Sequence, residues 1–218
     1  MNNTVRMRFA KTGRAKYISH LDLIRCLQRA VCRAGLPAAY SGGFHPHMQT
    51  SFAATLPLGF TSTSEILELG LTEEVPYGEV MERLNDVLPE DIRILEAGAP
   101  QFAFKELTYA LYTVELPCDD PAQLRTDLDQ FLAQPEILAQ KKTKKGLKEI
   151  DLKPMIEVTD IREEIGRLVL ELCLPAGSAA NLNPMLLLEA WQNSAGNAVK
   201  SPKICRTALL TAERSNFF

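Results

Sequence analysis

The sequence lacks the features that would place it in a membrane or in a disulfide-bonded, secreted class. No apolar run approaches the roughly 18 residues that a membrane-spanning helix needs, and the N-terminal stretch MNNTVRMRFAKTG has no long apolar segment of the kind found in secretory signals. The five cysteines are odd in number and no two are spaced CxxC, which argues against a disulfide framework, a zinc ribbon and an iron–sulfur cluster. We therefore expect a cytoplasmic protein with reduced cysteines and no membrane contact.

Charge is unevenly distributed along a chain whose net charge is only -3. Residues 1–64 contain eight Lys or Arg and one acid, whereas residues 65–99 contain ten acids and two Arg. This asymmetry favours a polyanionic partner. The alternative is that the two segments pack together and neutralise each other. With 46% hydrophobic residues, the chain has enough apolar surface for a globular fold.

The first half shows periodicities of strands and helices in the order β-α-β-β-α-β. Alternation of apolar and basic residues predicts a strand over 5–13, with Val5, Met7 and Phe9 on one face and Arg6 and Arg8 on the other. A helix is predicted to begin after Ser19, which opens a sequence resembling a capping box, and to end at Gly35. Its predicted buried stripe is Leu21, Ile24, Leu27 and Val31. The remaining elements are extended segments at 49–59, 64–72 and 91–98 and an amphipathic helix at 77–88.

The second half repeats this element order. We predict a strand at 107–117, a helix at 120–134, extended pieces at 136–142 and 147–156, a strand at 166–175, a helix at 183–191 and a strand at 201–211. The predicted fold is therefore α+β, with two tandem ferredoxin-like (βαββαβ) domains of antiparallel sheet over residues 1–99 and 106–218. A single continuous α+β domain is the alternative.

The stretch YSGGFHPHMQTSF contains two of the three histidines, His45 and His47. A His-x-His pair on an extended chain puts both imidazoles on one face, so zinc binding is one interpretation, although no acid or cysteine lies nearby in sequence. Anion binding is another, because the two glycines permit positive φ, so that their backbone N–H groups can face a phosphate, and because aromatic rings can stack on unpaired bases. The residues concerned are Tyr40, Ser41, Gly42, Gly43 and Phe44. A stiff turn without a ligand is the third interpretation.

His20 is the candidate catalytic residue. At the first turn of a helix the dipole disfavours the imidazolium form, which would leave a neutral ring available as a general base. Metal-independent RNA cleavage needs such a base, an acid and cations on the phosphate. The alternative is a surface or capping residue without catalytic work.

Two basic clusters are candidates for phosphate binding. Arg25, Arg29 and Arg33 recur every four residues and should form one ridge on their helix. A second cluster, in QKKTKKGLKEIDLKP, reads as a basic hairpin or loop that supplies affinity and salt dependence but no base readout. Its members are Lys141, Lys142, Lys144, Lys145 and Lys148. A solvated loop without a partner is the alternative.

Several runs resemble a known family: YISHLDLIRCLQRAVCRAGLPAAYSGGFHPHMQTSFAATLPLGFTSTSE, KKTKKGLKEIDLKP and NLNPMLLLEAW. They are similar to the radical-SAM-linked family of bacterial proteins, described as a domain of unknown function, over nearly the whole chain. Members of that family occur beside or fused to a radical S-adenosylmethionine protein, in neighbourhoods with ribosomal proteins and a ribonuclease, which implies a role in modifying or maturing ribosomal or transfer RNA. This chain has no CxxxCxxC for a radical cluster, so it resembles the accessory half.

The first of those runs also resembles the helix and glycine loop of the CRISPR-repeat endoribonucleases, which are built from tandem ferredoxin-like domains. Their catalytic histidine lies near the first helix, as His20 does here, whereas their glycine-rich sequence near the C-terminus is missing. We therefore expect an RNA-binding accessory protein that acts with a radical-SAM partner, without cofactor, metal or catalytic activity of its own. The alternatives are a metal-independent endoribonuclease and a protein–protein adaptor without RNA contact.

Overall fold

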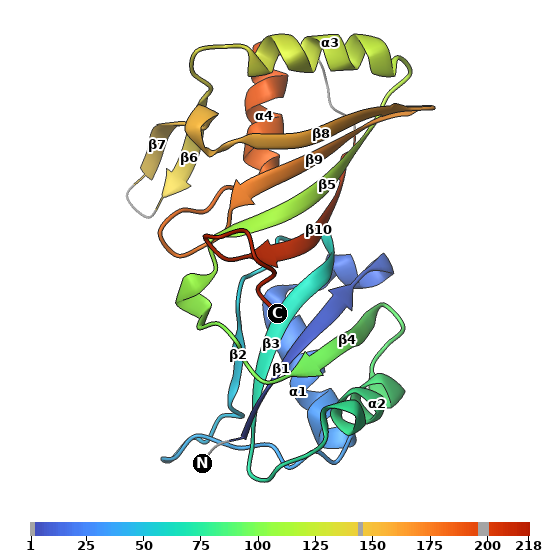
Figure 1. Ribbon diagram of the computed structural model, residues 1–218, viewed down its shortest axis with the longest axis vertical. Helices are drawn as coiled ribbons and strands as arrows, with labels where there is room; N and C mark the ends of the chain where they lie inside the picture. Colours follow the sequence, from blue (N-terminus) through green and yellow to red (C-terminus); the bar gives the residue numbers. More distant parts are fainter. Residues whose placement is uncertain (1–2, 144–145, 196–200) are drawn as a thin grey trace. The chain divides into compact units, whose positions relative to one another are not determined.

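A computed structural model describes residues 3–143, 146–195 and 201–218 of the chain, with the backbone alone described at 142–143 and 195 (Figure 1). Within these residues the fold is α+β, with four α-helices, eight strands of mixed, mostly antiparallel sheet and a two-stranded hairpin. The helices are α1 (His20–Arg33), α2 (Tyr77–Val87), α3 (Pro121–Leu132) and α4 (Pro184–Ala195). The strands are β1 (Asn3–Lys11), β2 (Thr50–Phe52), β3 (Thr61–Leu71), β4 (Ile92–Gly98), β5 (Tyr109–Pro117), β6 (Leu138–Thr143), β7 (Gly146–Asp151), β8 (Glu157–Glu164), β9 (Arg167–Pro175) and β10 (Lys203–Leu210).

The chain divides into two compact units. Unit 1 comprises residues 1–107 and 206–218, and unit 2 comprises residues 108–205. Strand β10 begins in unit 2 and ends in unit 1. The domain boundaries predicted from the sequence are 1–99 and 106–218; the units differ from them by giving residues 100–107 and the last thirteen residues to unit 1. Those residues include Arg206, which forms a buried ion pair with Glu65 of unit 1.

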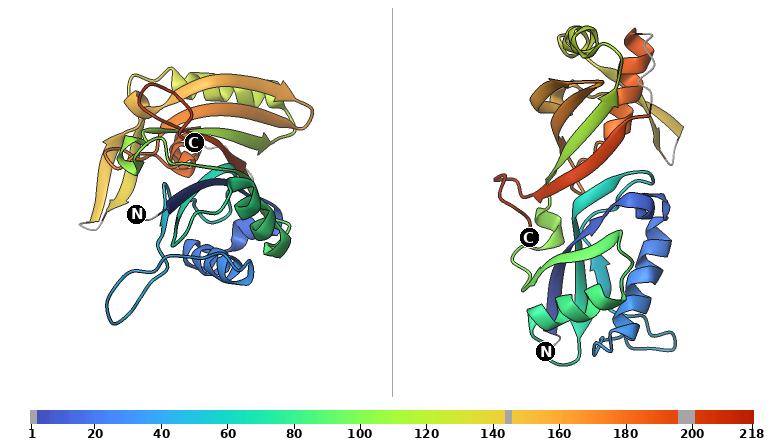
Figure 2. Two further views of the ribbon diagram at one scale, coloured as in Figure 1. Left: turned by 60° about the horizontal axis from the view of Figure 1, so that its bottom comes forward. Right: turned by 90° about the vertical axis from the view of Figure 1, so that its right-hand side faces the viewer.

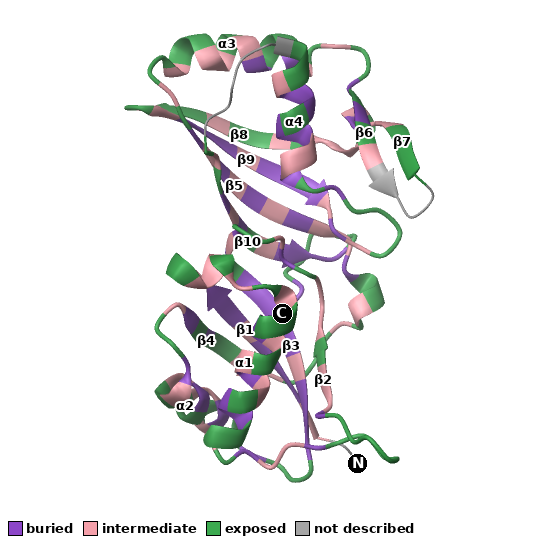
Figure 3. Ribbon diagram, turned by 180° about the vertical axis from the view of Figure 1, so that it is seen from behind, coloured by how far each residue is buried: buried purple, intermediate pink, exposed green. Residues whose placement is uncertain are grey.

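In unit 1, β1 lies between β4 and β3, and β3 also pairs with β2 and β10. The pairings of β1 with β3 and β4, and of β2 with β3, are antiparallel. As predicted from the alternation of residues, Val5, Met7 and Phe9 share one face of β1, where they join a core with both α1 and α2. Figure 3 shows buried residues along β1 and β3 and exposed residues on the outward side of α1.

The buried stripe of α1 agrees with the predicted one at Leu27 and Val31 and differs from it at Leu21. Leu23, Leu27, Ala30 and Val31 are buried, whereas Leu21 is 64% exposed. Both stripes have helical spacing, and only contact with β1 and β3 decides which one faces the core. The predicted ends of α1 are confirmed: the Ser19 hydroxyl accepts a hydrogen bond from the Asp22 amide at 3.1 Å, and Gly35 follows the helix with a φ of 63°.

In unit 2, β9 lies between β5 and β8, and both pairings are antiparallel. The β6–β7 hairpin forms a separate two-stranded sheet. The sequence did not predict strand β8. This strand lies at the edge of the sheet, where most of its side chains are exposed, so charged residues obscure the alternation of apolar and polar positions. Gly166, with a φ of 75°, closes the turn that joins β8 to β9.

None of the described helices is long and apolar enough to cross a membrane.

Candidate nucleic-acid interface

The segment between α1 and β2 forms a projecting loop in unit 1 (Figure 2). Tyr40 and Met48 pair as an isolated antiparallel bridge at its base. The Ser41 amide donates to the His47 carbonyl at 2.8 Å, and the His47 amide donates to the Ser41 hydroxyl at 2.9 Å. These bonds close the loop across its neck, so residues 42–46 form its tip.

The tip is fully solvated. Phe44 is 101% exposed, so its ring is not buried against any residue that the structure describes. The sequence predicted that both glycines could adopt positive φ; Gly43 does so, with a φ of 105°, whereas Gly42 does not. A single left-handed glycine is thus enough to reverse the chain here.

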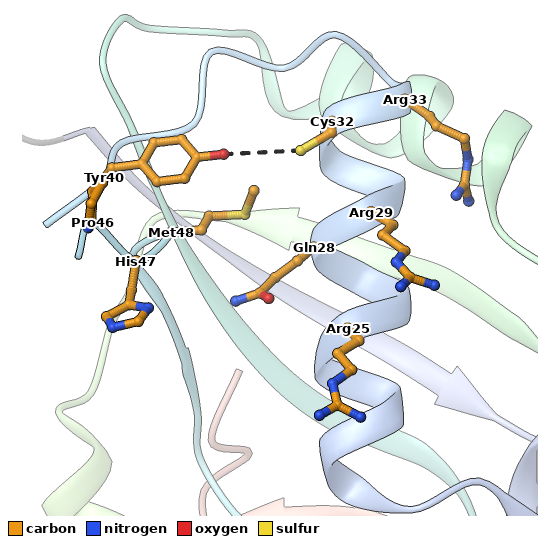
Figure 4. Close-up of a pocket in the computed structure, with 9 residues that line it drawn as sticks. All are labelled: Arg25, Gln28, Arg29, Cys32, Arg33, Tyr40, Pro46, His47 and Met48. Atoms are coloured by element: carbon orange, nitrogen blue, oxygen red, sulfur yellow. Dashed lines mark hydrogen bonds between the residues drawn. The ribbon is translucent and has the colours of Figure 1, made fainter.

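A groove with a volume of about 540 Å³ separates α1 from this loop (Figure 4). It is lined by Arg25, Gln28, Arg29, Cys32, Arg33, Tyr40, Pro46, His47 and Met48. Figure 4 shows Cys32 pointing toward Tyr40 and Gln28 on the loop side of the helix, while the three arginines follow the neighbouring stripe, here called the arginine rim, from which Arg29 and Arg33 extend away from Tyr40. The arginine ridge and both ends of the loop therefore line one groove, as a shared binding site would need.

The three arginines differ in how they are held. Arg25 forms an exposed ion pair with Asp22 at 3.1 Å, and Arg33 donates to the Val87 carbonyl at 3.0 Å. Arg29 has no hydrogen bond or ion pair with any residue that the structure describes. Arg29 thus presents a complete guanidinium to solvent, with five N–H donors. At the other end of the ridge, the hydrogen bond from Ser19, followed by the one from Arg25, lowers the pKa of Asp22 below its ordinary value of 3.8.

Two contacts fix the groove wall. The Tyr40 hydroxyl and the Cys32 sulfur lie 3.9 Å apart and share a weak hydrogen bond, which raises the pKa of the Tyr40 phenol above its ordinary value of 10.0. The Tyr40 ring therefore stays neutral at physiological pH. Across the groove, the Gln28 amide nitrogen donates to the Thr50 hydroxyl at 3.3 Å.

The three histidines do not gather in one place. His47 lines the groove, and His45 lies exposed in the loop tip. His20 is half-buried at the start of α1, where its ring meets the edge of Phe52 at a centroid distance of 5.2 Å. Phe52, which His20 contacts, follows His47 by five residues, and five residues of extended chain span about 16 Å. His20 and His47 therefore lie apart. The described residues contain no group of three or more His, Cys, Asp or Glu that could hold a metal ion.

Arg6 and Arg8 of β1 are neutralised by acids. The Arg6 guanidinium is buried, where it pairs with Glu68 and stacks on the rings of Phe104 and Phe217 at 5.3 and 4.9 Å. Arg8 pairs with Glu96 at 3.1 Å. The acidic 65–99 segment thus cancels the charges of Arg6 and Arg8, as one of the two interpretations of the charge asymmetry holds. Among the described residues, no ion pair joins this acidic segment to the arginines of α1.

The lysine cluster of unit 2 lies on the β6–β7 hairpin. Lys141 and Lys148 are direct cross-strand partners, and the Lys141 ammonium donates to the Asn181 carbonyl at 3.0 Å. Lys148 is exposed. Lys144 and Lys145 lie outside the described residues, and so does the side chain of Lys142. The predicted hairpin is thus confirmed in its two strands.

Sequence reasoning missed four groove residues: Gln28, Cys32, Pro46 and Met48. Gln28 and Cys32 lie three residues after Arg25 and Arg29, so a helical wheel places them on the stripe beside the arginines. Met48 gives no such signal, because only the Tyr40–Met48 bridge turns its side chain toward α1.

The sequence of residues 4–184 matches the family described as "Uncharacterized protein conserved in bacteria (DUF2344)". The chain belongs to this family. A comparison with curated proteins found no match. Family membership covers the arginine helix, the glycine loop and the lysine hairpin, and it assigns no activity to any of them.

Proposed function

We propose that this DUF2344 protein binds RNA through the groove of unit 1 and acts as an accessory to a radical-SAM protein in the modification or maturation of ribosomal or transfer RNA. The observation that carries the RNA-binding part is the arginine rim beside an aromatic-walled groove. The radical-SAM partner and the class of RNA rest on the sequence resemblance alone.

The arginine rim suits a polyanion. Residues four apart on a helix rise by about 6 Å, so Arg25, Arg29 and Arg33 present three cations in a row along about 12 Å. Each guanidinium offers several N–H donors in a plane that matches phosphate oxygens. Since Arg29 has no partner among the described residues and the Arg25–Asp22 pair is exposed, a phosphate displaces little when it binds.

The lysine hairpin is a second phosphate-binding element in this proposal. Lys141 and Lys148 bear like charges at directly opposed positions, an arrangement that is unfavourable in isolation. A bound anion would relieve the repulsion. The hairpin adds affinity without base readout, because no aromatic residue lies within either strand to stack on a base. The large apolar side chain exposed on β7 is Leu147.

We also propose that both halves of the chain are ferredoxin-like. The order β1-α1-β2-β3-α2-β4, with β1 between β3 and β4 and with β2 beside β3, supports this for the first half. The second half has the order β5-α3-β8-β9-α4-β10, with the β6–β7 hairpin inserted after α3. This arrangement underlies the resemblance to the CRISPR-repeat endoribonucleases. The endoribonuclease alternative gains nothing from His20, whose ring contact with Phe52 supplies no proton acceptor or donor.

The proposal is tested by the salt dependence of binding. Fluorescence anisotropy with labelled transfer RNA and ribosomal RNA fragments, from 50 to 300 mM salt, should give a linear fall of log K with log salt. Arg29→Ala should weaken binding and make the slope shallower by about 0.7 to 0.9, the contribution of one phosphate contact. Arg93→Ala is the matched control, because it removes the same charge from the exposed side of β4 and leaves the groove intact.

Three outcomes separate the proposal from its alternatives. Undetectable binding to every RNA at about 50 mM salt, where the electrostatic contribution is strong, refutes it. Cyclic-phosphate ends formed in EDTA and abolished by His20→Ala would establish the endoribonuclease instead. Co-purification with the radical-SAM protein after ribonuclease treatment, together with no RNA affinity, would establish the adaptor.

A further inference from the structure

The groove in unit 1 has an apolar interior as well as a cationic rim, and phosphate binding alone does not require that interior. Resting on the proposed function, we infer that the groove takes one unpaired nucleotide: its base stacks on the Tyr40 ring inside the groove, and its phosphates lie on the arginine rim. The substrate class is then single-stranded or looped RNA, and A-form duplex is excluded from the groove.

The interior of the groove matches the faces of a base. Met48 is 8% exposed and lies between the helix and the loop, so its thioether forms an apolar surface there (Figure 4). Tyr40 is 49% exposed, and its hydroxyl lies 3.9 Å from the Cys32 sulfur. A half-exposed aromatic ring is what base stacking uses in sites for single-stranded RNA.

Gln28 gives the interior one polar group for a base edge. Its amide nitrogen is committed to the Thr50 hydroxyl. The amide oxygen has no hydrogen-bond partner among the described residues, so it can accept from an N–H group of a base. One acceptor among apolar surfaces is typical of a pocket that orients a small ring system.

The placement of charge sets the direction in which a nucleotide binds. Gln28 and Cys32 lie on the side of α1 that faces the loop, whereas the three arginines occupy the neighbouring, solvent-exposed stripe (Figure 4). A base pointing inward therefore leaves its phosphates at the rim. The volume of about 540 Å³ lies in the range of pockets that hold one small ligand.

A duplex cannot use both parts of this groove. In an A-form helix the bases are stacked and paired, and only phosphates, 2′-hydroxyls and shallow base edges are accessible. Duplex RNA would meet the arginine rim alone. Single-stranded and duplex RNA should therefore differ in affinity, a difference that a simple cationic surface would not produce.

The test compares a fluorescein-labelled single-stranded RNA 10-mer with the same strand annealed to its complement, at one salt concentration. We expect the single strand to bind at least tenfold more tightly. Tyr40→Leu keeps apolar bulk and removes the ring, so it should weaken single-strand binding by about 5- to 150-fold, the range for loss of one stacked base. Tyr40→Phe keeps the ring and should stay within about threefold of the original affinity.

The duplex serves as the internal control. Arg29→Ala should weaken binding of both forms, whereas Tyr40→Leu should leave duplex binding unchanged. As a second readout, a 4-thiouridine in the single strand should crosslink to residues 40–48 on irradiation, and unchanged circular dichroism shows that each variant remains folded.

Failure of this inference differs from failure of the proposed function. Equal affinity for both forms, with no effect of Tyr40→Leu, overturns the nucleotide pocket and leaves RNA binding in place. Absence of binding to either form overturns both. A single-strand preference that Tyr40→Leu does not reduce also overturns the pocket, because another surface must then read the unpaired base.

Discussion

The ion pair between Glu65 and Arg206 gives the sharpest test of how unit 1 is held together. Both side chains are 2% exposed, and three N–O contacts of 2.9, 2.6 and 2.7 Å join them. Glu65→Gln keeps the shape of the side chain and removes its charge, so the buried Arg206 guanidinium loses this counter-ion. Breaking a buried pair in this way costs about 3–5 kcal/mol.

That cost is large against a total stability of about 5–15 kcal/mol for a typical domain. With a urea m-value of about 2 kcal/mol/M, the unfolding midpoint should fall by about 1.5–2.5 M. Far-UV circular dichroism follows the transition, because the single Trp191 lies in unit 2 and its fluorescence reports that unit.

The matched control is Glu96→Gln, the same substitution in the exposed pair with Arg8, where the carboxylate is 50% exposed. Its cost should be no more than about 1 kcal/mol. If Glu65→Gln shifted the midpoint no further than Glu96→Gln, the structural reason given for the attachment of residues 206–218 to unit 1 would be wrong.

Three further predictions concern smaller features. Burial lowers the pKa of Lys11 below its ordinary value of 10.5. Because the pKa is lower in the folded than in the unfolded chain, the Lys11 charge destabilises the fold at neutral pH, and the free energy of unfolding should rise as the pH approaches 10.5. Denaturation at several pH values should show a steeper rise for the original protein than for Lys11→Met. Gly43→Ala should cost about 1–3 kcal/mol in thermal unfolding because a side chain is strained at a φ of 105°, and Gly42→Ala, at an open position outside that region, should change little; equal effects would refute the argument. Ser19→Ala removes the hydroxyl that caps α1 and should cost about 1 kcal/mol by the same measurement, whereas an unchanged melting temperature would show that the cap contributes nothing.

The sequence alone predicted much of the fold, because local signals dominate where they are strong. The capping residue and the terminal glycine of α1 fixed both ends of that helix, and alternation in β1 assigned its core face. The β8 strand escaped prediction because its edge position tolerates a polar sequence. Which stripe of α1 is buried depended on partners distant in sequence, so two helical spacings fitted the sequence equally well.

For the candidate site, the arginine spacing and the double glycine were sufficient to name the rim and the loop. That they enclose a groove follows from the Tyr40–Met48 bridge and from the packing of α1 on β1 and β3. The same packing separates His20 from His47, which the sequence left free to meet. It also removes Arg6 and Arg8 from the cationic surface by pairing them with Glu68 and Glu96.

The sequence by itself determined the charge pattern, the ends of α1 and the presence of a glycine loop beside an arginine helix, since these depend on neighbours within a few residues. Tertiary structure decided which cations remain available and that an aromatic wall faces Gln28. The physical reason is that charge neutralisation and groove formation are long-range events, in which the partner of each side chain comes from a different strand or helix.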